Sequence, residues 1–146
     1  MPNDLISCFL LICQRAMQEK DGVYSAFRIV DIFFVDPIAE VPLERQAVQL
    51  TFLGSVRGYP GDATEHTVSI RLIRPDGDVT VLNESKATLE AKEAYRDLPR
   101  GLNVVGEIGV IPKQMGTHYI TLTLDGEEVT RVPFTLRARA EADEKN

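Results

Sequence analysis

Residues 119–136 read YITLTLDGEEVTRVPFTL, and this stretch decides the fold. Every second residue before the Asp125-Gly126 pair is aliphatic, and the end of the stretch alternates in the same way. A half-buried strand places alternate side chains on one face. We therefore expect two antiparallel strands joined as a hairpin around Asp125-Gly126. The residues predicted to face the interior are Ile120, Leu122, Leu124, Val132, Phe134 and Leu136.

The numbering of these residues also predicts the hairpin loop. A two-residue loop would place even-numbered residues opposite odd-numbered ones, which would mismatch the two apolar faces. A loop of three residues brings the faces together. We therefore predict a type I turn followed by a glycine bulge, with Gly126 left-handed and with Leu124 not paired to Glu127.

A second alternating stretch begins at Val68, where Val68, Ile70 and Leu72 are predicted to face the interior. It leads into the turn sequence Pro75-Asp76-Gly77, in which proline presets the backbone and Asp-Gly tolerates left-handed geometry. We expect a two- or four-residue loop here, with Leu72 paired to Val81.

The other strands are less regular. Residues 48–56 alternate as a half-buried strand, and residues 102–110 alternate around glycines that suggest a bulge or bend. Apolar residues crowd both faces between Tyr24 and Val35, which is typical of a central strand or of one bent by a bulge. Residues 5–14 fit a buried strand better than a helix capped by Asp4.

These segments define one domain without internal repeats. Seven or eight short strands with no alternating helices predict an all-β sandwich or barrel over residues 1–138. Residues 84–97 are rich in Ala, Glu and Lys and fit either one short helix or an irregular edge strand. Residues 139–146 have no apolar face, so we expect a disordered charged tail.

Several short motifs resemble those of a known family. The sequence contains Ile12-Cys13-Gln14, Asp21-Gly22-Val23-Tyr24, Arg74-Pro75-Asp76-Gly77 and Gly116-Thr117-His118-Tyr119. Together they are similar to a family of small, uncharacterised bacterial β-sandwich proteins. The closing Gly-x-x-Tyr, Asp-Gly and Val-Pro-Phe elements resemble those of immunoglobulin-like domains. The resemblance implies an antiparallel immunoglobulin-like sandwich and supplies no activity.

Charge and hydropathy bound the partners and the compartment. The 146-residue chain carries a net charge of -6, which argues against nucleic acid and anionic membranes as partners. The longest apolar run, Leu5 to Cys13, is too short to span a membrane and lacks the basic start of a secretory signal. Cys8 and Cys13 would face opposite sides of a strand, beyond disulfide reach, so we expect reduced thiols and a cytoplasmic protein.

Candidate chemistry is sparse. A thiol-dependent hydrolase would pair Cys8 or Cys13 with His66 or His118. Packing in the core would instead make the thiols inert, and His118 shares its face with the inward Ile120. The two histidines lack the spacing of a metal site, and His66 fits a solvated loop. We assign no catalytic residue, metal or cofactor.

Contact residues are easier to suggest. Tyr59 lies in a polar loop and could anchor a partner, or it could fold back over the end of the sandwich. Arg131, Arg137 and Arg139 would form a basic stripe that either binds an acidic peptide or protects a strand edge. We therefore predict a non-enzymatic module that binds another protein or a second copy of itself. A small-molecule or glycan-binding domain is the alternative, with the hydrolase behind it.

Overall fold

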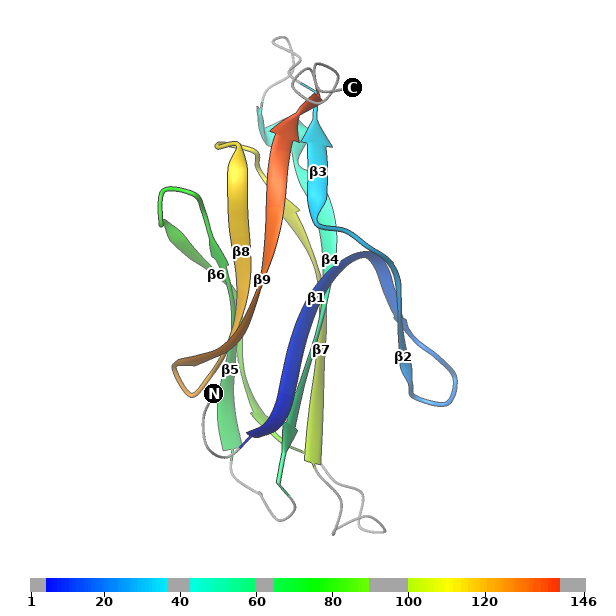
Figure 1. Ribbon diagram of the computed structural model, residues 1–146. Coiled ribbons are helices and arrows are strands. Elements are labelled where there is room, and N and C mark those ends of the chain that lie inside the picture. Colours follow the sequence, from blue (N-terminus) through cyan, green and yellow to red (C-terminus); the bar gives the residue numbers. More distant parts are fainter. Residues whose placement is uncertain (1–4, 37–42, 60–64, 90–99, 140–146) are drawn as a thin grey trace.

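A computed structural model describes residues 5–36, 43–59, 65–89 and 100–139. The elements are the strands β1 (Leu5–Gln18), β2 (Tyr24–Ile29), β3 (Ile32–Val35), β4 (Val48–Gly58), β5 (Glu65–Ile73), β6 (Val79–Thr88), β7 (Arg100–Val110), β8 (Gly116–Leu124) and β9 (Glu127–Ala138), with a 3₁₀ helix at Leu43–Gln46. They form a four-stranded sheet, ordered β2-β1-β4-β7, and a five-stranded sheet, ordered β3-β9-β8-β5-β6 (Figure 1). The all-β sandwich is confirmed, with nine strands rather than seven or eight. Neighbouring strands are antiparallel except β3 and β9, which are parallel.

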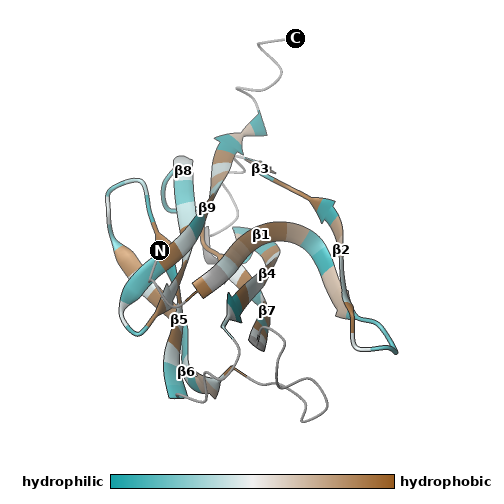
Figure 2. Ribbon diagram, turned by 60° about the horizontal axis from the view of Figure 1, so that its bottom comes forward, coloured by the Kyte–Doolittle hydropathy of each residue, from teal (hydrophilic) through white to brown (hydrophobic). Residues whose placement is uncertain are grey.

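The interior between the sheets contains the residues that the alternation predicted. Ile70 on β5, Leu122 on β8 and Phe134 on β9 are each at most 1% exposed. The four-stranded sheet faces them with Ile12 on β1 and Val56 on β4, which are also fully buried. The first half of β1 appears as a largely apolar ribbon in Figure 2. The N-terminal run forms strand β1, which confirms the predicted strand over residues 5–14.

The loop between β8 and β9 differs from the prediction. Leu124 pairs directly with Glu127, so the loop has two residues, and both Asp125 (φ 51°) and Gly126 (φ 83°) are left-handed. The prediction of a three-residue loop is therefore wrong, whereas the left-handed Gly126 is confirmed. The mismatch is corrected within β9 instead, where the register shifts so that Val129 is an extra, bulged residue. The primed turn matches the strand twist, and a bulge restores the apolar alignment beyond it.

The loop between β5 and β6 also differs. Leu72 pairs with Thr80 rather than Val81, and Val81 is 54% exposed. Five residues, 74–78, separate the strands, and the Arg74 N–H donates to the Asp78 carbonyl at 2.9 Å. A five-residue loop reverses the expected parity, so the predicted pairing with Val81 is wrong. β6 also extends through Thr88, so residues 84–88 are strand rather than helix, and residues 90–97 lie outside the described residues.

Two further expectations are corrected. Of the two alternatives for the run 24–35, the central strand is wrong, because β2 and β3 are outermost strands of their sheets. β7 has no bulge at its glycines and pairs with β4 in one continuous register. Gly106 is instead opposite Phe52, where an added Cβ would lie 2.4 Å from the ring. Its missing side chain makes room for a core aromatic ring.

The predicted tail begins where β9 ends. Arg139 forms an ion pair of 2.5 Å with Asp36, which follows β3. The rest of the predicted tail, residues 140–146, lies outside the described residues.

Candidate functional site

The three predicted contact residues lie in different parts of the fold. Tyr59 follows β4 of the four-stranded sheet and is 54% exposed. Arg131 and Arg137 lie on β9 of the five-stranded sheet. They do not mark a free strand edge, because β3 pairs with β9 opposite Arg137. The structure therefore does not bring these three side chains into one site.

Arg131 is already engaged by its own strand and by β8. Its guanidinium forms two hydrogen bonds with the Glu128 carboxylate, one of them 2.8 Å long. It also lies over the Tyr119 ring, 5.1 Å from the ring centroid. The Arg131 guanidinium holds the pKa of the Glu128 carboxyl below its usual range. The Nε and Nη2 donors of Arg131 are therefore already engaged within β9.

The two cysteines are in structural positions. Cys13 is fully buried, and the Cys8 thiol donates to the Val129 carbonyl at 3.2 Å. Neither is in a disulfide. Burial raises the pKa of both thiols, which lowers the fraction of thiolate and hence their nucleophilicity.

The histidines also make structural contacts. His118 stacks on Phe134 with the ring centroids 5.1 Å apart, and its Nδ1 is 3.0 Å from the Gly116 carbonyl oxygen. Burial lowers the pKa of His118. The prediction that His66 lies in a solvated loop is wrong. His66 lies on β5, where its Nδ1 is 2.7 Å from an Asp125 carboxylate oxygen. His66 thus ties β5 to the β8–β9 turn.

Within ranges 5–36, 43–59, 65–89 and 100–139, no three His, Cys, Asp or Glu side chains gather closely enough to hold a metal ion. In the same ranges, no helix is long and apolar enough to cross a membrane.

One surface that the sequence did not predict is the β2–β3 edge, defined by Phe27, Ile29, Ile32 and Phe34. These are four of the eleven large apolar side chains that the described residues expose, yet they fall within eight positions of the chain. Ile29 is 71% exposed and Phe27 is 48% exposed. β2 is an outermost strand of one sheet and β3 an outermost strand of the other, so two consecutive strands of the chain each supply an edge of a different sheet. The apolar run was visible in the sequence, but its exposure was not.

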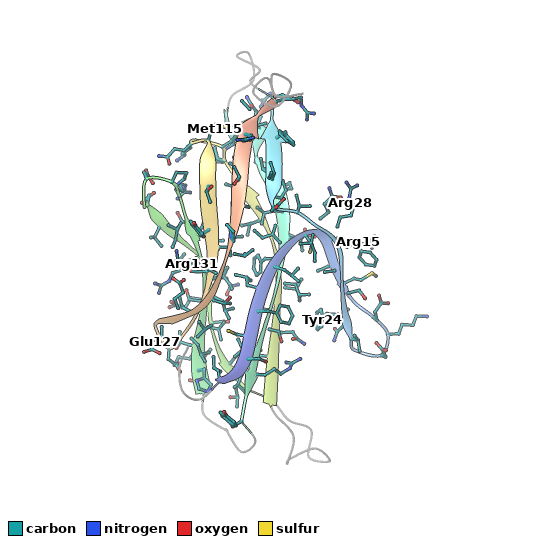
Figure 3. The ribbon with its side chains drawn as sticks, in the orientation of Figure 1. Arg15, Tyr24, Arg28, Met115, Glu127 and Arg131 are labelled. Atoms are coloured by element: carbon teal, nitrogen blue, oxygen red, sulfur yellow. The ribbon has the colours of Figure 1, made fainter. Side chains whose placement is uncertain are left out.

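The second such surface is the hairpin groove, between the β1–β2 hairpin and the outer face of the four-stranded sheet. β1 is bent, since its first half pairs with β4 and its second half pairs with β2 (Figure 1). Tyr24 on β2 projects back toward the sheet (Figure 3). The deeper part, about 300 Å³, is lined by Phe9, Gly22, Val23, Tyr24, Leu53, Ser55, Arg57 and Asn103.

The groove continues toward the far edge of the sheet. A wider part of about 560 Å³ shares Gly22, Tyr24 and Asn103 with the deeper part. Lys86 on β6 and Gly101 on β7 line this wider part. Because the hairpin stands over the outer face, β4 is buried on both sides, whereas the alternation of residues 48–56 predicted a half-buried strand.

The family is identified by residues 8–137, which match a family of unknown function, DUF6941. The chain belongs to the DUF6941 family. The DUF6941 match runs from Cys8 in β1 to Arg137 in β9, so it includes β2 to β8 and most of β1 and β9. It includes the hairpin groove and the β2–β3 edge. No curated protein matches this DUF6941 chain.

Among solved structures, the DUF6941 chain is similar to the Pseudomonas fluorescens alkylpurine DNA glycosylase AlkC bound to DNA containing an abasic site analog. The TM-score is 0.44 and the sequence identity is 11%. The match covers 88% of this chain and 30% of that chain, so this chain spans under a third of that protein.

That structure contains DNA. The exclusion of nucleic acid as a partner, which rested on the net charge of this chain alone, is withdrawn. The physical reason is that net charge describes the whole chain, whereas binding to phosphates depends on where the basic side chains lie. An overall charge of -6 therefore does not rule out a nucleic-acid partner.

Proposed function

We propose that this protein is a non-enzymatic module that binds another protein through the β2–β3 edge. The observation that supports this most is the exposure of Phe27, Ile29, Ile32 and Phe34 on two consecutive outermost strands. Several large apolar side chains exposed close together in the chain, on strands that end their sheets, are a feature of contact sites. Free strand edges offer unpaired N–H and C=O groups to a partner strand.

The structural contacts of the reactive side chains also support a non-enzymatic role. The thiols of Cys8 and Cys13 have raised pKa values, and His118 packs against the core ring of Phe134. An activated thiol needs a lowered pKa and a neighbouring base. The described residues supply neither to these cysteines.

We also propose the finer assignments that the sequence suggested. The resemblance to bacterial immunoglobulin-like sandwiches remains our proposal for the origin and type of this fold. A cytoplasmic location is supported by the two cysteines, which are thiols rather than a disulfide.

The experiment compares partner capture by three forms of the tagged protein, in lysate of the source cells with quantitative mass spectrometry. The test variant replaces Ile29 and Phe34 with Lys. The matched control replaces Val79 and Val81 with Lys, since these valines are 51% and 54% exposed on the opposite outermost strand β6. We expect the same partners with wild type and control, and their loss with I29K/F34K.

Light scattering over a range of protein concentrations separates self-association from binding to a different protein. A dimer that the control retains and I29K/F34K loses would identify a second copy as the partner. Capture that is equal for all three forms, or a monomer that captures nothing, would contradict the proposal.

A further inference from the structure

The hairpin groove has the size and the apolar lining of a small-ligand site. Its deeper part of about 300 Å³ is at the lower end of ligand pockets. Phe9 on β1, Leu53 on β4 and Tyr24 on β2 supply apolar surface from three strands. Phe9 keeps 47% of its surface exposed although Leu53 beside it is buried. An apolar group bound here would cover that exposed ring.

The groove is cationic in an otherwise acidic protein. The chain has 22 acidic residues, yet among the described residues no Asp or Glu lines either part of the groove. Arg57 lines the deeper part and Lys86 the wider part. Lys86 has a partner, Glu65, at 3.3 Å. Arg57 makes no side-chain hydrogen bond or ion pair within the described part of the chain.

Gly101 sets the position of Arg57. The two residues are paired across β4 and β7, and an added Cβ on Gly101 would lie 1.9 Å from Arg57 Nη1. The Arg57 side chain therefore lies across β7, where only glycine leaves space for it. Arg57 lines the deeper part of the groove and Gly101 the wider part, so the guanidinium lies where the two parts meet, and Asn103 lines both parts.

A buried hydroxyl adds a polar group to the same wall. Ser55 is 2% exposed, and its Oγ has no hydrogen-bond partner within the described residues. A buried polar atom without a partner destabilises the fold, so such an atom calls for an explanation. Ser55 lines the groove beside Phe9, its partner on β1.

From these observations we propose that the hairpin groove binds a small organic anion, of the aromatic or short aliphatic carboxylate class. The apolar body contacts Phe9, Leu53 and Tyr24. The carboxylate accepts hydrogen bonds from the Arg57 guanidinium, which is suited to planar, two-oxygen anions. The Ser55 hydroxyl donates a further bond to an acceptor on the ligand. This ligand site is separate from the β2–β3 edge.

Isothermal titration calorimetry tests the proposal with 1-naphthoate and octanoate as carboxylates, phenyl phosphate as an alternative anion, and 1-naphthalenemethanol as a neutral analogue. We expect the carboxylates to bind and the neutral alcohol to bind about tenfold more weakly, because it lacks the charge-assisted bond. Arg57→Gln should weaken carboxylate binding about tenfold. Ser55→Ala should weaken it by a smaller factor.

Two further variants complete the test. Arg137→Gln removes a half-buried arginine from the opposite sheet and should leave binding unchanged. Val23→Glu places a carboxylate at the groove from a side chain that is 60% exposed, so the fold should tolerate it while the anion is repelled. Circular dichroism and urea unfolding establish that each variant is folded. I29K/F34K should bind the carboxylates as wild type does, which separates this proposal from protein binding.

Several results would overturn the proposal. One is binding of the neutral alcohol as tight as that of 1-naphthoate, and another is carboxylate binding that neither R57Q nor V23E weakens. Tighter binding of phenyl phosphate would replace the carboxylate with a phosphate ester. Absence of binding by every probe, or binding only of a single-stranded oligonucleotide added as a fifth probe, would remove the small-anion assignment altogether.

Discussion

Replacing Gly106 with alanine should destabilise the protein through a single contact. An ideal Cβ at this position would lie 2.4 Å from Cζ of Phe52 and 2.7 Å from its Cε1. Non-bonded carbons prefer roughly 3.5–4.0 Å, so the ring tip would have to withdraw by about 1 Å. Phe52 is only 3% exposed and packs in the core, which leaves it little room to move.

The magnitude follows from the cost of overpacking a core. Forcing one extra methyl group into a packed interior costs about 1–3 kcal/mol. For a chain of this length, that corresponds to a fall of roughly 3–9 °C in the melting temperature. Urea unfolding followed by circular dichroism gives the free energy of unfolding, and calorimetry gives the temperature.

A matched control lies on the same strand. Gly109→Ala adds the same methyl group, but its nearest neighbour, at 3.0 Å, is the side-chain amide of the exposed Gln49, which can move away. We expect G109A to remain within about 0.5 kcal/mol of wild type. Combining G106A with Phe52→Leu should remove the clash, so that G106A costs about 1 kcal/mol less in that background. Equal stability of G106A and G109A, or an unchanged cost of G106A in the F52L background, would refute a clash with the Phe52 ring.

Three other predictions concern the turn, a buried histidine and the thiols. Gly126→Ala should lower the free energy of unfolding by about 1 kcal/mol, because Gly126 has φ 83°, a conformation that costs alanine energy, while an added Cβ meets nothing within 4 Å. Gly126→Asn should lower it by less, since asparagine tolerates this conformation better. Equal losses for the two variants in urea unfolding would contradict a backbone origin. Burial lowers the pKa of His118 in the folded protein. The contribution of neutral His118 to the free energy of unfolding is therefore complete above the unfolded pKa of about 6.5 and is lost as the pH falls from there toward the folded pKa. His118→Asn should flatten the dependence of stability on pH in this range, and an unchanged slope would contradict the prediction. At neutral pH, Cys8 and Cys13 should react with a thiol reagent far more slowly than an added Ser7→Cys on the exposed surface, and rates as fast as that of the added cysteine would disprove their inertness.

The even numbering of the inward-facing residues on both strands explains how far the β8–β9 hairpin could be predicted. The alternation correctly placed Ile120 and Phe134 in the interior, because the face of a strand depends on local sequence alone. It also required that one residue be left unpaired. It could not decide whether that residue lay in the loop or within β9. The bulge at Val129 follows from the strand twist and the packing of both sheets, which no local pattern contains.

The hairpin groove and the β2–β3 edge show the same limit. Apolar side chains at Phe27 and Ile29 suggested a central strand, since burial is the usual fate of such residues. The structure places β2 outermost, and Ile29 is 71% exposed. The predicted contact Tyr59 was chosen for the composition of its loop, whereas Tyr24 faces the groove because β1 bends after pairing with β4.

The sequence by itself determined the all-β class and the inward faces of the most regular strands, where Ile70, Leu122 and Phe134 are buried, because alternation acts within a few residues. Only the tertiary structure decided the order of the strands, and with it the position of Arg57 across Gly101 and the groove beneath the hairpin. Strand order depends on pairings between residues far apart in the chain, such as Cys8 with Val56 and Gly54 with Val104. Their free energy arises only when the two sheets pack together.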